Sequence, residues 1–290
     1  MEAGLTAYIG DFMSWKTRKE KGVLQFAWVL LLALFATGCA NQELLNAQPQ
    51  MVENNTAELK ASETDNPHFY YVGFAADSTL SVFSNEIMLA KGLFDERFGS
   101  EGRSVVMLNS SQTMDNIPMA TPENLNATLE DVAQKMDLEQ DVLVLYISGH
   151  GGYNKGVKVN FWPHHSSWVK PENLRQELDA LGFKWKVIVV SACFSGQFAN
   201  QLNDIDTMVI TASSPDRPSF GCTSSDTYTY FGDAYFNNQL PQSLSFEEAY
   251  FAAKEEITLK ENQMGYPNSL PMLVGGKAIR DKLDSMFIQP

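Results

Sequence analysis

The sequence predicts an α/β domain whose central sheet is mostly parallel and is covered by helices on both faces. From residue 69 onward, short apolar segments alternate with segments of helical periodicity. Two segments, DVLVLYIS at 141–148 and KVIVVSA at 186–192, are almost entirely apolar, which is typical of strands buried on both faces. With 44% hydrophobic residues, a chain of 290 residues is long enough for one well-buried domain.

The expected elements follow one another in a regular order. Strands are expected at residues 69–76, 104–109, 141–148, 186–192 and 206–214. Helices are expected at residues 86–98, 121–136, 171–181, 228–238, 245–261 and 277–286. The second helix has clear start signals, because Thr121 is a suitable N-cap and Pro122 suits the first helical position. In such sheets ligands bind outside the carboxyl ends of the strands, so reactive residues are sought just after each strand.

The first 39 residues are expected to be a targeting signal and not part of the fold. A basic segment, KTRKEK at 16–21, precedes an uncharged apolar run at residues 23–37, which is shorter than the about 20 residues of a membrane span. The ending Ala36-Thr37-Gly38-Cys39 resembles a bacterial lipobox, which implies that Cys39 is lipidated. Met13 gives a more usual start for such a signal. An uncleaved N-terminal anchor is the alternative.

Both alternatives place the main domain outside the cytoplasm. The lipobox resemblance implies a lipid-anchored protein of the bacterial cell envelope that faces the periplasm, and Ala40 after Cys39 favours the outer membrane. Residues 40–67 are polar and aperiodic, which predicts a flexible tether before a domain at 68–290. The formal net charge of −14 argues against a nucleic-acid partner, because phosphates would repel such a surface.

Reactive side chains follow the two most apolar strands. His150 comes two residues after the strand at 141–148, and Cys193 comes directly after the strand at 186–192. Because parallel strands end at the same edge of a sheet, His150 and Cys193 are expected to lie close together. An adjacent imidazole accepts the proton of a thiol and leaves the nucleophilic thiolate. The backbone N–H groups of Gly151 and Cys193 are the expected oxyanion donors.

Both motifs resemble those of caspase-like cysteine peptidases. They are ISGHGG at 147–152 and SACFSG at 191–196, and the 43 residues from His150 to Cys193 are close to the spacing in caspases. Within that clan the chain is most similar to the legumain family, which contains asparaginyl endopeptidases and the GPI-transamidase subunit, and especially to bacterial lipoprotein members. ATPENL at 120–125, VITASSPDRPSFGC at 209–222 and YFGDAYF at 230–236 share in the resemblance. It implies a caspase-like three-layer sandwich and a cysteine endopeptidase.

The resemblance also implies a substrate pocket beside the nucleophile. Ser219 and Asp233 match two positions that line this pocket in legumains, and Ser191 occupies a third, where the eukaryotic enzymes often have Glu. The Arg expected soon after the first strand has no equivalent near Phe83 and Ser84. With one acid and one base missing, the pocket is less charged than in legumains, and strict asparagine specificity is not favoured.

The expected activity is therefore hydrolysis of a peptide or protein substrate through a thioester acyl-enzyme on Cys193, with no metal or cofactor. Transpeptidation, in which an amine replaces water, is a variant of the same chemistry. The adjacent His164 and His165 point to opposite sides of an extended chain, which disfavours a shared metal. Cys222 is expected to be a buried small residue, although a regulatory disulfide with Cys193 is an alternative. A non-catalytic envelope lipoprotein that uses the same fold for binding is the second hypothesis.

Overall fold

The computed structural model describes residues 42–63 and 66–287. The expected signal at residues 1–39, with the lipidation site Cys39, lies outside the described residues. Contacts divide the chain into two units, residues 1–47 and residues 48–290. In the described part of the chain, no helix is long and apolar enough to cross a membrane.

The second unit has a central six-stranded sheet in the order β2-β1-β3-β7-β8-β9. The elements in chain order are β1 (Phe69–Ala75), α2 (Val82–Arg97), β2 (Ser104–Leu108), α3 (Pro122–Lys135), β3 (Val142–Ser148), β4 (His150–Gly152), β5 (Gly156–Phe161), β6 (His165–Val169), α4 (Pro171–Leu181), β7 (Trp185–Ser191), α5 (Gly196–Leu202), β8 (Thr207–Thr211), α6 (Tyr230–Gly232), the π-helix η1 (Asp233–Gln239), α7 (Phe246–Met264), β9 (Met272–Gly275) and α8 (Lys277–Phe287). All neighbouring strands of this sheet are parallel except β9, which is antiparallel to β8. The predicted fold class is confirmed.

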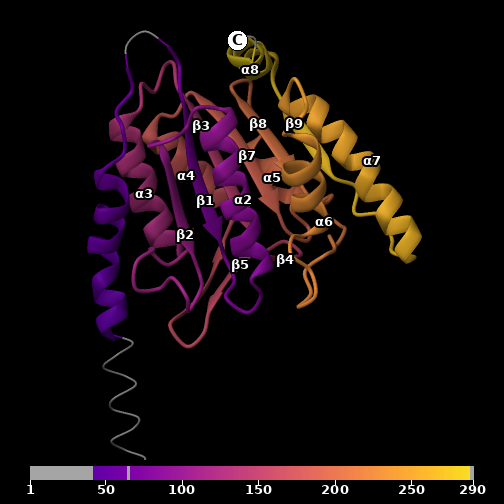
Figure 1. The fold of residues 1–290 in the computed structure, drawn as a ribbon, viewed down its shortest axis with the longest axis horizontal. Helices are drawn as coiled ribbons and strands as arrows, with labels where there is room; N and C mark the ends of the chain where they lie inside the picture. Colours follow the sequence, from indigo (N-terminus) through magenta and orange to yellow (C-terminus); the bar gives the residue numbers. More distant parts are fainter. Residues whose placement is uncertain (1–41, 64–65, 288–290) are drawn as a thin grey trace, which may run out of the picture. The chain divides into compact units, whose positions relative to one another are not determined.

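Helices cover both faces of this sheet, which makes three layers (Figure 1). On β3, Val144 and Tyr146 belong to one buried cluster, together with apolar residues of α2, η1, α7 and α8. Leu143 and Leu145 belong to a second cluster, together with residues of α3, α4 and α5. Every residue of β3 is buried, because the alternate side chains of the strand supply both clusters.

Three parts of the fold were not expected from the sequence. Strands β4, β5 and β6, which follow β3 and precede α4 in the chain, form a small antiparallel sheet. Strand β9 adds an antiparallel edge to the main sheet, and helix α5 begins three residues after Cys193. The small sheet includes residues 161–168, FWPHHSSW, with the two adjacent histidines, and the second half of this segment belongs to β6.

The expected flexible tether at residues 40–67 is corrected for most of its length, because residues 42–57 form a helix. In the second unit, the Gln48 side chain accepts hydrogen bonds from Met119 N at 2.8 Å and from Asn124 Nδ2 at 2.9 Å. Thr56 Oγ1 donates to Asp131 of α3 at 2.6 Å. Val52 is buried as well. The segment looked aperiodic because it packs mainly through polar side chains instead of an apolar stripe.

Candidate active site

The carboxyl ends of β3 and β7 bring the two predicted catalytic residues to one edge of the sheet. Ser148 and Ser191, the last residues of these strands, are register partners, and Gly149 N donates to Ser191 O at 3.1 Å. His150 and Cys193 each follow this pair by two residues. The backbone segments that carry His150 and Cys193 therefore leave the sheet at the same edge.

The position of His150 is set by the hairpin of β4 and β5. Its ring meets the buried ring of Phe83 edge-on, with the ring centroids 5.0 Å apart. The hairpin is tied to α5 by one side chain, because Gln197 Oε1 accepts from Gly156 N at 3.1 Å and Gln197 Nε2 donates to Gly152 O at 3.2 Å. Since α5 begins just after Cys193, this amide links the segments that carry the imidazole and the thiol.

Cys193 is half-buried, and its sulfur lies against the loop that follows β8. Ser219 N donates to Sγ at 3.3 Å, and the thiol donates to Ser219 O at 3.4 Å. In the described part of the chain, no hydrogen bond joins Sγ to the His150 ring; such bonds often form only when substrate is bound. Cys222 is a free thiol like Cys193. Its pKa is raised by burial and then by the nearby Cys193.

In the turn that carries Cys193, the backbone N–H of Phe194 is hydrogen-bonded to another residue that the structure describes, and that of Cys193 is not. Phe194 N donates to Arg217 O at 2.8 Å, and Phe194 adopts a positive φ of 58°. Cys193 N donates to no acceptor among the described residues, so this N–H is free to meet an oxyanion. A non-glycine residue with positive φ is uncommon and often marks a functional turn.

Gly151 lies directly against the backbone of Cys193. A Cβ atom at position 151 would come within 1.8 Å of the Cys193 carbonyl oxygen and 2.7 Å of its carbonyl carbon. Only glycine allows this approach, because any side chain would collide with the main chain of Cys193. The two expected oxyanion donors therefore belong to backbone segments in direct contact.

The three predicted pocket residues have different surroundings. Ser219 contacts the sulfur of Cys193, as described above. Ser191 is buried, and its Oγ is 3.0 Å from Thr229 Oγ1. The carboxylate of Asp233 lies 3.6 Å from Lys260 Nζ of α7 and accepts from Asn237 of η1 at 3.0 Å. The structure therefore brings Ser219 and Ser191 near Cys193 and gives Asp233 partners of its own.

Glu86 of α2 is a polar residue of this region that the sequence analysis did not single out. It is fully buried, and its carboxylate accepts hydrogen bonds from Ser148 Oγ and from Thr229 Oγ1, the second at 2.8 Å. Burial raises the pKa of Glu86, while the hydroxyl donors oppose that shift. A signal was present, since Glu86 falls three residues after Phe83 and four before Ala90, on the buried stripe of α2.

The raised pKa of Glu86 predicts how stability depends on pH. Consider pH values between the ordinary carboxyl pKa of about 4.3 and the higher pKa of Glu86 in the folded chain. In this window the unfolded chain has released the proton while the folded chain still holds it. The free energy of unfolding is therefore expected to fall as pH rises through that window. Tyr71 of β1 and Tyr146 of β3 are titratable groups that interact with Glu86. Burial and then the charge of Glu86 raise the pKa of both tyrosines, so neither loses a proton in this window and offsets the effect of Glu86.

Urea unfolding of the wild type and of Glu86→Gln, from pH 4 to pH 8, measures this effect. The glutamine variant cannot titrate, so its stability is expected to fall less steeply over the window. Equal slopes for the two proteins would contradict the prediction.

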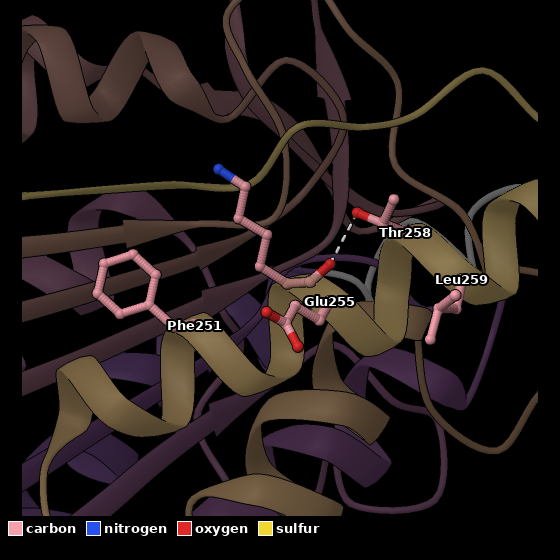
Figure 2. A pocket seen from close by; sticks show the side chains of 5 residues that line it. Phe251, Glu255, Thr258 and Leu259 are labelled. Atoms are coloured by element: carbon pink, nitrogen blue, oxygen red, sulfur yellow. Dashed lines mark hydrogen bonds between the residues drawn. The ribbon is translucent and has the colours of Figure 1, made fainter.

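A separate hollow lies on α7 and is lined by that helix alone (Figure 2). It has a volume of about 500 Å³ and is lined by Phe251, Lys254, Glu255, Thr258 and Leu259. Thr258 Oγ1 donates to the Lys254 carbonyl at 2.8 Å, so this hydroxyl serves the helix itself. The lining has no thiol or imidazole, so the hollow lacks the groups for the chemistry predicted at Cys193.

One comparison with known proteins, against family profiles, covers both motifs at the strand ends. The profile of the peptidase C13 family, which is the legumain family, matches residues 124–274 and so includes both His150 and Cys193. Among solved structures, caspase-1 from Spodoptera frugiperda matches with a TM-score of 0.47 and 12% identity, over 74% of this chain and 94% of that one. No curated protein matches. The chain belongs to the peptidase C13 family and is a cysteine-type peptidase.

Proposed function

We propose that this protein is an endopeptidase in which Cys193 is the nucleophile and His150 is the proton carrier. The observation that carries this proposal is the pairing of the two strand ends. Ser148 and Ser191 are in register, and a reactive side chain follows each of them by two residues. Belonging to the peptidase C13 family implies a peptide or protein substrate.

The proposed reaction has two halves. In the first, the Cys193 sulfur attacks the carbonyl carbon of the substrate, His150 takes the thiol proton, and the N–H groups of Gly151 and Cys193 hold the oxyanion. His150 then gives the proton to the leaving amine as the C–N bond breaks, which leaves a thioester. In the second half, His150 takes a proton from water as the water attacks the thioester. The carboxylic acid leaves and the Cys193 thiol is restored.

The proposal also includes the N-terminal segment. A basic flank, an apolar run and Cys39 support a lipid anchor in the bacterial cell envelope, with the peptidase domain in the periplasm and the outer membrane favoured by Ala40. Metabolic labelling with a clickable palmitate tests the anchor. Label on the wild type and none on Cys39→Ser supports lipidation, whereas equal labelling excludes Cys39 as the site.

Cleavage of a peptide library by the purified full-length protein, in reducing buffer from acidic to neutral pH, tests the proposed activity. We expect internal cuts, together with a covalent adduct on Cys193 after incubation with a peptidyl acyloxymethyl ketone. The sequence before each cut reports how the pocket near Ser191 and Ser219 selects its substrate. A protein that cuts no peptide and whose Cys193 reacts no faster with iodoacetamide than free cysteine would favour the binding-module hypothesis.

A further inference from the structure

The buried carboxyl group of Glu86 lies behind both strand ends of the candidate active site. Its side chain is fully buried, and no basic side chain of the described residues forms an ion pair with it. Three hydrogen bonds reach the carboxylate: one from Ser148 Oγ, one from Thr229 Oγ1 at 2.8 Å and one from Thr229 N at 3.3 Å. An acid on helix α2 is thus joined to the end of β3 and to the loop before α6.

The network continues from Thr229 to the end of β7. Thr229 Oγ1 is 3.0 Å from Ser191 Oγ, and Ser191 is the register partner of Ser148. Ser148 precedes His150 by two residues, and Ser191 precedes Cys193 by two residues. Glu86 therefore has a direct contact to one catalytic strand and a contact through a single hydroxyl to the other.

The start of α6 is shaped around this carboxyl group. A Cβ atom at Gly232 would lie 2.0 Å from Glu86 Oε2, so only glycine leaves room for the acid. Gly232 N donates to Thr229 Oγ1 at 2.9 Å, which fixes the hydroxyl that links Glu86 to Ser191. The backbone of α6 and of Thr229 before it is therefore held close to the Glu86 carboxyl group.

Stability alone is a poor reason for an acid at this place. A buried carboxyl group without a cationic partner is costly, and its hydrogen bonds offset only part of that cost. Departures of this kind from the rules of a stable core are found mainly at functional sites. The contacts of Glu86 lead to the two strands that carry the reactive side chains.

We propose that Glu86 is a positioning residue, whose carboxyl group holds the ends of β3 and β7 so that His150 and Cys193 are aligned for proton transfer. The inference rests on the proposed function. Small displacements of reacting groups slow the chemical step strongly, since a shift of about 1 Å can lower its rate by about 100-fold. An acceptor that fixes both strand ends therefore affects the rate of the chemical step more than the binding of substrate.

Glu86→Gln is the main test, and Asp141→Asn is its matched control. Asp141 is another buried acid next to β3, at the opposite end of the strand, where it accepts from His68 N and Asp137 N at 2.8 Å each. Thr229→Val is a second variant, which keeps the acid but removes the hydroxyl between Glu86 and Ser191. For each full-length protein we would measure kcat and KM on a peptide cut by the wild type, the melting temperature, and Cys193 alkylation by iodoacetamide from pH 5 to pH 9.

We expect Glu86→Gln to lower kcat by about 10- to 100-fold with little change in KM, and to shift the pH profile of Cys193 alkylation. Thr229→Val should act in the same direction, whereas Asp141→Asn should lower the melting temperature but keep kcat and the alkylation profile. The inference is overturned if Glu86→Gln keeps both, or if activity falls in proportion to melting temperature in Glu86→Gln and Asp141→Asn alike.

Alkylation separates this inference from the proposed function, because it needs no substrate. If the wild type cuts no peptide but the alkylation profile of Glu86→Gln still shifts, the peptidase proposal fails and the positioning role stands. If the wild type cuts peptides and Glu86→Gln is unchanged, the positioning role fails and the peptidase proposal stands.

Discussion

Cys193→Ala and His150→Ala are each expected to lower kcat for peptide cleavage by about 10⁴-fold or more. Alanine at 193 removes the only sulfur that the paired strand ends present, so no thioester can form. Alanine at 150 removes the group that is proposed to take the thiol proton and return it to the leaving amine. Because the proposed mechanism makes the two residues act as one unit, the double variant should be no slower than either single variant. Cleavage of a fluorogenic peptide measures all three.

Two other residues of the same types serve as controls. Cys222→Ala removes the other described thiol, which packs against the core, and should leave kcat near that of the wild type. His165→Ala removes an imidazole of β6 whose Nε2 is 2.7 Å from Ser167 Oγ, and should also be nearly neutral. Equal losses for Cys222→Ala and Cys193→Ala would show that the nucleophile has been assigned wrongly.

Gly151→Ala is the second change for which we expect a large effect. The new methyl group would collide with the carbonyl group of Cys193, which is main chain and cannot rotate away as a side chain can. The β4 strand must then move away from the nucleophile, and this displaces both the Gly151 N–H and the neighbouring His150. We expect kcat to fall by about 100-fold or more, together with a lower melting temperature.

Gly92→Ala is the matched control for this substitution. Gly92 lies in α2, and a Cβ atom there would meet nothing within 4 Å. Alanine is favoured over glycine within a helix by about 0.5–1 kcal/mol, so this variant should be as stable as the wild type or more so, with unchanged kcat. If Gly151→Ala behaves like Gly92→Ala, the contact between Gly151 and Cys193 is not needed for catalysis.

The central strands and the two reactive residues could be predicted because each has a strong local signal. Strands β3 and β7 are almost entirely apolar, and His150 and Cys193 each stand just beyond the end of one of them. Strand β4 has no such signal, because HGG has neither apolar alternation nor strand propensity, and it forms by pairing with β5. Its strand conformation is imposed by tertiary contacts.

The role of Glu86 could not be predicted for a different reason. Its position on the buried stripe of α2 could be found from helical periodicity, but its partners come from distant parts of the chain. Ser148 is 62 residues away and Thr229 is 143 residues away, so only the folded chain brings them together. The helix at residues 42–57 is similar, because the partners of its polar side chains, such as Asp131, are distant in sequence.

Under the proposed lipid anchor at Cys39, the packed helix before β1 limits how far the peptidase unit can reach from the membrane. A flexible linker over the whole of residues 40–67 would span about 100 Å when fully extended. Since Gln48 is already bound to the peptidase unit, only residues 40–47 separate that unit from Cys39, and they reach at most about 30 Å. Under the proposed anchoring, the peptidase unit would stay close to the membrane surface. Its substrates would then be proteins whose cleavable segments lie within that distance of the membrane.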